Sequence, residues 1–321
     1  MSESYPQGKI FFLAGKETTW GESVSPTKDL GLHQSADVTE ASNTVYSYGF
    51  GSANAAARAT GKYDVTISTE IQVQHGRFLE YGCARGATVN DAGAGDPYTH
   101  TFTPSDTGAL TPFTSQFSMD GAADILWRAR GCLINSFTLK QDLDGVLTSS
   151  LDLIAKAPIK SSSVGTVVVD TLPTFPQSYA TLSFGAEGAE AAQSMCQNFE
   201  WTHNNNIIKS HGFGSRLPAA AVAGKAEEKF TFSAVFESTT ALERFWGAAS
   251  APIDGAVTEG GLIFSTSDAT PTRKIEVDFN NATFDEHRKS YPLDNVVMQD
   301  ISGTARSVET ITCMDDIDNW L

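Results

Sequence analysis

The amino-acid sequence predicts a mainly β protein built from two tandem antiparallel β-sandwich or barrel domains, each with one short packed helix. Three observations predict this fold class. Segments of alternating apolar residues dominate the chain, helical periodicity is confined to two short stretches, and a long block of sequence occurs twice. With 321 residues the chain can hold two domains of about 150 residues, and a hydrophobic fraction of 40% can fill their cores.

The duplication is clearest around a Gly-Phe-Gly-Ser motif. Residues 49–52 return as residues 212–215, a spacing of 212 − 49 = 163, and eight of the fourteen positions from 49 to 62 are identical in the second copy. After a two-residue insertion the spacing becomes 165, and beyond residue 143 it falls to 150. Convergent Gly- and Ala-rich composition is the alternative, but three blocks in the same order favour two domains. We place them at residues 1–165 and 166–321, joined by the Pro-containing segment 161–177, whose Val167-Val168-Val169 run is an alternative edge strand.

Each copy contains a long strand followed by a short helix. In the first copy the strand covers residues 63–73, and in the second it covers 229–237. Thr240 begins a helical segment that ends at Gly247, with its counterpart in the apolar residues just before Gly82. Residues 147–155 alternate again after an Asp144-Gly145 turn, which corresponds to Asp294-Asn295 in the second copy. We interpret the Gly-Phe-Gly-Ser motifs as turns before the long strands, because neither completes a phosphate-binding pattern.

The first copy is 165 − 150 = 15 residues longer than the second, and the excess falls between residues 82 and 143. The segment around residues 84–112 is rich in Gly, Asp, Thr and Pro, which predicts a long surface loop.

Composition and motifs argue against several classes of function. The formal charge is −16, and Lys and Arg form no cluster, so the chain should not bind the phosphates of DNA or RNA tightly. No metal-ligand or nucleophile motif occurs, which predicts a protein without cofactor, metal or catalytic residues. Cys83, Cys132, Cys196 and Cys313 are expected to be free thiols, and Asp315, Asp316 and Asp318 a solvated acidic tail. No apolar run of membrane-spanning length and no signal peptide are visible, so neither membrane insertion nor secretion is expected.

Several segments together resemble the tail tube (major tail) proteins of long-tailed, non-contractile viruses of bacteria and archaea. They are the opening Glu17-Thr18-Thr19-Trp20-Gly21-Glu22, the strand and helix ending at Gly82, residues 128–139 with their Gly131-Cys132 step into a strand, residues 199–206 with their Asn-Asn sequence, and the Phe230-Thr231-Phe232 block. The alternative is a surface β-sandwich that binds carbohydrate or acts on glycans, for which the five tryptophans could line a sugar site.

The resemblance implies a structural virion protein of the tail that is assembled in the host cytoplasm. It implies stacked rings that form a negatively charged channel for DNA delivery, with the tape measure protein in the lumen and tail tip and tail terminator proteins as further partners. Two tube-like domains in each chain imply homotrimeric rings with pseudo-sixfold symmetry, and a homohexamer is the alternative.

Within this hypothesis, two sets of residues are assigned roles. The lumen-facing candidates are Asp64, Glu70, Gln72, Glu228 and Glu237. The candidates for contacts between rings are Asp91, Asp96, Tyr98 and Thr107.

Overall fold

The computed structural model describes residues 10–51, 54–85, 90–92, 97–105, 108–119, 127–160, 172–193, 195–254, 258–269, 272–291, 296–317 and 320. They form a mainly antiparallel β structure with two short α-helices, α1 (Arg77–Cys83) and α2 (Thr240–Trp246), which confirms the prediction of a mainly β fold with two short helices. The strands are β1 (Ile10–Lys16), β2 (Lys28–Asp29), β3 (Leu32–Tyr48), β4 (Ala55–Gln72), β5 (Asn90–Ala92), β6 (Tyr98–Phe102), β7 (Phe113–Met119), β8 (Trp127–Asp142), β9 (Thr148–Ala155), β10 (Ala157–Lys160), β11 (Thr181–Ala186), β12 (Ala189–Ala192), β13 (Cys196–Asn204), β14 (Ile208–Ser210), β15 (Ala220–Val222), β16 (Glu227–Val235), β17 (Gly260–Ser267), β18 (Lys274–Ser290) and β19 (Met298–Asp315).

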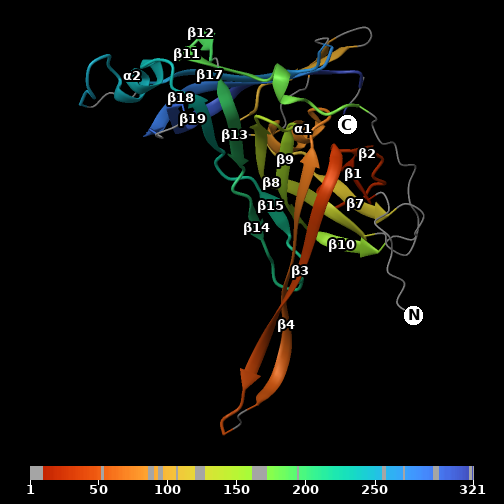
Figure 1. The fold of residues 1–321 in the computed structure, drawn as a ribbon. Coiled ribbons are helices and arrows are strands. Elements are labelled where there is room, and N and C mark those ends of the chain that lie inside the picture. The colour runs from red at the N-terminus through yellow and green to blue at the C-terminus, as the bar shows by residue number, and fades with distance from the viewer. Residues whose placement is uncertain are drawn as a thin grey trace, which may run out of the picture.

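A continuous series of antiparallel strands crosses the whole molecule in the order β3–β4–β9–β8–β13–β16–β19–β18 (Figure 1). β8 links the two halves of the chain, because it pairs with β9 on one side and with β13 on the other. β8 and β18 are long enough to take part in a second set of pairings. The first half of β8 pairs with β7, and β7 pairs with β1. In the same way the first half of β18 pairs with β17, and β17 pairs with β11.

The same order of pairing therefore occurs twice, as β1–β7–β8–β9–β4–β3 and as β11–β17–β18–β19–β16–β13. The registers agree at a spacing of 150: Ile134 opposes Leu153 and Phe284 opposes Gly303, and a register shift follows directly in each strand. Positive φ values recur at the same spacing, at Gly131 and at Asn281.

The long strands and helices correspond at a single spacing of 163. Val65 opposes Ala155 in the first copy. The equivalent of Ala155 in the second copy is Ala305, which opposes Glu228, so Glu228 is the equivalent of Val65, 163 residues later. The helices begin at Arg77 and Thr240, which are also 240 − 77 = 163 residues apart. The two-residue insertion inferred from the sequence is therefore absent from the strand pairing, and Val65 corresponds to Glu228 instead of Phe230.

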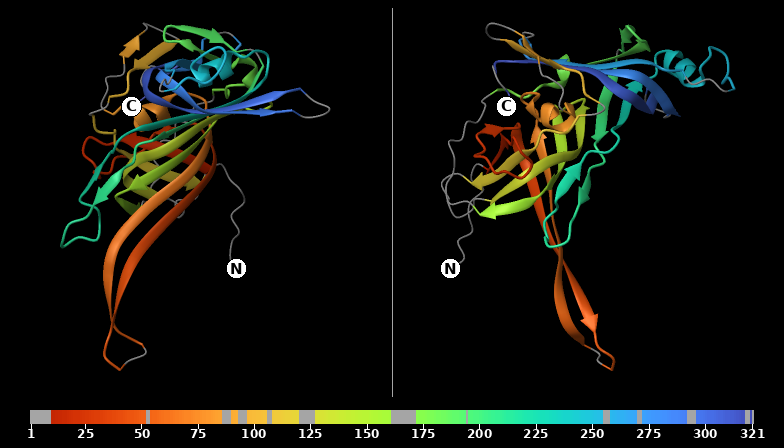
Figure 2. Two further views of the ribbon diagram at one scale, coloured as in Figure 1. Left: turned by 90° about the vertical axis from the view of Figure 1, so that its left-hand side faces the viewer. Right: turned by 180° about the vertical axis from the view of Figure 1, so that it is seen from behind.

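Both Gly-Phe-Gly-Ser motifs lie at hairpin ends, as predicted. The first follows β3 at the end of the long β3–β4 hairpin, which projects far from the body of the molecule, and the second lies between β14 and β15 (Figure 1). Both hairpins extend from the same side (Figure 2). Phe50 and Phe213 are fully exposed, and each precedes a glycine with φ near +80°, a conformation that glycine adopts without steric cost.

One hydrophobic core runs through both halves and centres on the junction of β8 and β13. The Phe137 ring lies 4.9 Å from Trp201 of β13 and 5.8 Å from Phe78 of α1, edge to face in both cases. The segment 17–22 and the Gly131-Cys132 step, both noted in the sequence, meet at the edge of the core. The buried Glu17 carboxylate accepts hydrogen bonds from the backbone amides of Gly131 and Gly21. These motifs thus have a structural role.

The structure also corrects or extends several expectations. The long strand of the first copy covers residues 55–72, and segment 84–112 contains β5 and β6, of which β6 pairs with the end of β19. Asp315 is buried and accepts hydrogen bonds from Trp320 Nε1 and the Ile317 amide, so the predicted solvated tail is wrong at this residue. The Val167–Val169 run and the Asp294-Asn295 turn lie outside the described residues.

Candidate assembly surfaces

One face of the central strand series is polar along its whole width. On β4 this face carries Asp64, Glu70 and Gln72, which alternate with the buried Val65, Ile67 and Ile71. On β9 the Asp152 carboxylate accepts hydrogen bonds from Ser68 and Ser136 of the neighbouring strands. Three of the five lumen-facing candidates thus share one polar face, although Asp64 also forms an ion pair with Lys209 at 2.6 Å.

Acidic residues outnumber basic ones in a hollow on this face. The hollow has a volume of about 430 Å³ and lies over β8, β13, β16, β19 and the end of β18. Its charged lining residues are Lys140, Asp142, Glu200, Glu286, Arg288 and Asp300. With four carboxylates against two cations, this part of the face has an excess of negative charge.

Glu228 does not belong to the polar face, which corrects its assignment as a lumen-facing residue. It is 6% exposed and points into the core at the junction of the two halves. Trp201 Nε1 donates to its Oε2 at 2.7 Å, and His203 Nδ1 lies 2.7 Å from its Oε1.

Asn205 continues this buried network across the junction. Its side chain donates to the Gly82 and Ile134 carbonyls and accepts from the Arg85 guanidinium at 2.7 Å. The Asn-Asn segment noted in the sequence therefore connects the end of β13 to the end of α1 and to β8 by hydrogen bonds.

The remaining candidates are placed as follows. Glu237 is exposed, but it lies in the connection between β16 and α2. Asp91 lies on β5 opposite His100, and the half-exposed Tyr98 lies on β6 opposite Asp315. Asp96 and Thr107 are outside the described residues.

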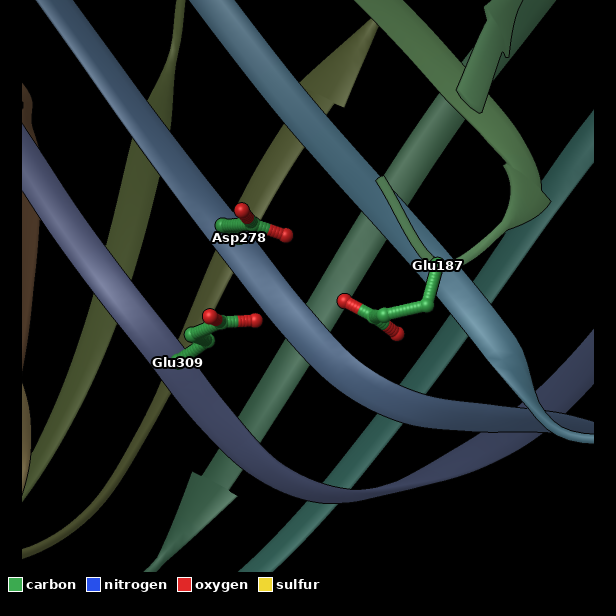
Figure 3. A group of neighbouring side chains, drawn as sticks. All are labelled: Glu187, Asp278 and Glu309. Atoms are coloured by element: carbon green, nitrogen blue, oxygen red, sulfur yellow. The ribbon is translucent and has the colours of Figure 1, made fainter. Parts of the chain in front are cut away.

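Three carboxylates gather on the second half of the chain (Figure 3). Glu187 of the β11–β12 turn, Asp278 of β18 and Glu309 of β19 offer oxygens within 4.8 Å of one another, a donor set that hard divalent cations accept. Burial, followed by repulsion from Glu309 and other acids, raises the pKa of Asp278 to about 6. Glu187 and Glu309 are exposed, as surface acids without an ion commonly are.

No helix in the described part of the chain is both long and apolar enough to cross a membrane.

A family model described as phage tail tube protein matches residues 8–305, which is most of the chain. The chain belongs to the phage tail tube protein family. A search of the curated proteins gives no match. The tail tube protein is therefore a structural component of the virion tail, from a family of structural proteins that are not enzymes, and it assembles into a tube with other tail proteins.

Three of the candidates chosen from the sequence, Asp64, Glu70 and Gln72, lie on the polar face, but the sequence analysis did not predict the junction network. The apolar alternation of Phe230 and Phe232 places Glu228 two positions earlier on the same inward face, so the strand period contained the signal for its burial. For Arg85 and Asn205, which are 120 residues apart, local patterns gave no signal.

Proposed function

We propose that the tail tube protein polymerises as stacked rings whose polar sheet faces line a negatively charged channel for genome DNA. The excess of carboxylates around the hollow on that face supports this role, since a channel of like charge keeps DNA from adhering. Glu70, Gln72 and Asp152 are then channel-facing residues, together with the polar side chains of β8 and β16.

We further propose that three chains form each ring. The observation that carries this proposal is the repeated strand order, in which the two halves join edge to edge through β8 and β13. Two equivalent units in each chain supply six units from three chains, and head-to-tail contacts of this kind can close into a ring. Six chains per ring, with one half outside the tube, is the competing arrangement.

Cryo-electron microscopy of assembled tubes tests both statements. We expect a central channel bounded by the polar face and three chains in each layer. A layer of six chains would refute the trimeric ring. If neither concentrated protein nor virion tails show this chain in the wall of a tube, the proposed tube is itself refuted.

We propose two contacts between stacked rings. One is segment 84–112, and the other is the end of the β3–β4 hairpin, which exposes Val45, Tyr46, Tyr48 and Phe50. Deleting residues 86–96 spares β6 and should give folded rings that fail to stack. Tubes of normal length from this variant would exclude the segment from the contact.

The tail tip, tail terminator and tape measure proteins are the further partners in this proposal, and assembly takes place in the host cytoplasm.

A further inference from the structure

Two strand edges of the central series are open in the part of the chain that the structure describes. Among the described residues β3 pairs with β4 alone, and residues 283–290 of β18 pair with β19 alone. The two edges lie at opposite ends of the series, and the β18–β19 hairpin extends away from the body (Figure 2). Unpaired edges of this length are templates for pairing with another chain, so each edge needs an explanation.

The junction inside the chain shows what occupies the equivalent edge. β3 corresponds to β13 at the spacing of 163, because Glu40 opposes Val65 and His203 opposes Glu228. β18 corresponds to β8 at the spacing of 150. Within the chain the edge of β8 is covered by β13, with Glu200 opposite Lys140 and His203 opposite Phe137. By this equivalence the strand that would pair with the open edge of β18 is a β3 strand. The chain's own β3 lies at the far end of the series, so this β3 would come from another copy of the chain.

We propose that residues 37–41 of β3 pair antiparallel with residues 286–290 of β18 in a second copy of this chain. This inference rests on the proposed tube and names the contact that closes its rings. Transfer of the internal register places Asp37 opposite Ser290, Thr39 opposite Arg288 and Glu40 opposite His287.

Charge on the two edges agrees with this register. Residues 37–41 carry two acids, Asp37 and Glu40, and no base. Residues 286–290 carry Arg288 and Lys289 next to His287, and their one acid, Glu286, lies opposite the uncharged Ala41 in this register. Opposite charges on facing or diagonal positions stabilise a strand pair, and two identical β3 edges would repel each other. The contact is therefore head to tail.

The helices provide an independent observation. All of α1 is buried, and Trp320 and Cys313 from the second half of the chain lie against its start at Gly76. Its counterpart α2 has one buried residue, and its Phe245 is 39% exposed. A second copy joined at β18 would lie beside α2 as the second half of the chain lies beside α1.

Disulfide trapping tests the register. Strands in register bring opposed Cα atoms to about 4.5–5.5 Å, within the range of a disulfide, whereas positions displaced by two residues lie beyond it. The test variant is Asp37→Cys with Ser290→Cys, and the matched control is Thr39→Cys with Ser290→Cys. Tubes are assembled under reducing conditions and then oxidised. Burial raises the pKa of the native Cys132 thiol to about 12 and of Cys196 to about 11, which suppresses competing thiolates.

We expect the test variant to give covalent dimers and closed trimers on a denaturing gel, about tenfold more than the control. Intact tubes without this cross-link, or with equal cross-linking of both variants, would overturn the β3–β18 register while leaving the tube in place. Absence of tubes in the unmodified protein under all assembly conditions would instead refute the proposed function.

Discussion

At the residue scale, Asp278 carries a charge that the folded chain disfavours. Burial and the neighbouring Glu309, Glu190 and Glu187 raise its pKa to about 6, and its Oδ1 has no hydrogen-bond partner. Because the folded pKa lies above the unfolded one, protonation favours the folded state. This contribution is fully present below about pH 4 and is lost as the pH rises through 6.

We therefore expect Asp278→Asn to raise the melting temperature at pH 7.5 and to have little effect at pH 4.5. Thermal unfolding at both pH values measures the difference, with Asp285→Asn, an exposed acid on the same strand, as the control. An equal gain at both pH values would show that charge on Asp278 is not the cause.

Unlike Asp278, the buried Glu228 carboxylate has hydrogen-bond partners on both of its oxygens. Its replacement by Ala leaves the Trp201 indole N–H and His203 Nδ1 without their hydrogen-bond partner, and each buried polar group left unsatisfied costs about 1–3 kcal/mol. Glu228→Gln keeps one acceptor oxygen and should cost less. Chemical denaturation measures both variants, and Glu227→Ala, at the exposed neighbouring position, should leave the free energy of unfolding nearly unchanged. A loss below 1 kcal/mol for Glu228→Ala would contradict this role.

At the scale of elements, the β3–β4 hairpin projects its apolar end into solvent. A single exposed phenyl group is ordinary, but Val45, Tyr46, Tyr48 and Phe50 are all exposed on one element. If this end contacts the adjacent ring, Phe50→Ser should slow tube elongation without changing the stability of the subunit. Tube length by electron microscopy and melting temperature are the two measurements. Phe213→Ser, at the shorter hairpin, is the matched comparison. Tubes of full length from Phe50→Ser would exclude a contact through the Phe50 side chain.

The elements also show how far the sequence could predict the fold. Alternation around Val65 and Ile67 located β4, and apolar residues near Gly82 and Gly247 located both helices, because these signals are local. The pairing of β6 with β19 joins residues more than 200 positions apart, such as His100 and Cys313, and no local pattern encodes it. The spacing of 163 in the strands was also hidden, because a shift of two residues preserves the inward and outward alternation.

At the scale of the whole molecule, the acidic face should matter only in the assembled tube. Glu70→Lys with Asp152→Lys places cations on the proposed channel face, where they would bind DNA phosphates and release counterions. Asp254→Lys with Glu259→Lys makes the same change in charge at exposed positions in the connection after α2. We expect virions with the first variant to eject their genome more slowly, with a delay that shrinks as salt is raised, and virions with the second to eject it normally.

Ejection is followed by the fluorescence of a DNA-binding dye after receptor triggering, once microscopy has shown tails of equal length. Glu70→Gln with Asp152→Asn separates loss of acid from gain of base and should have a smaller effect than the lysine variant. Normal ejection from full-length tails of the lysine variant, or equal slowing by both lysine pairs, would mean that the polar face does not line the path of the DNA.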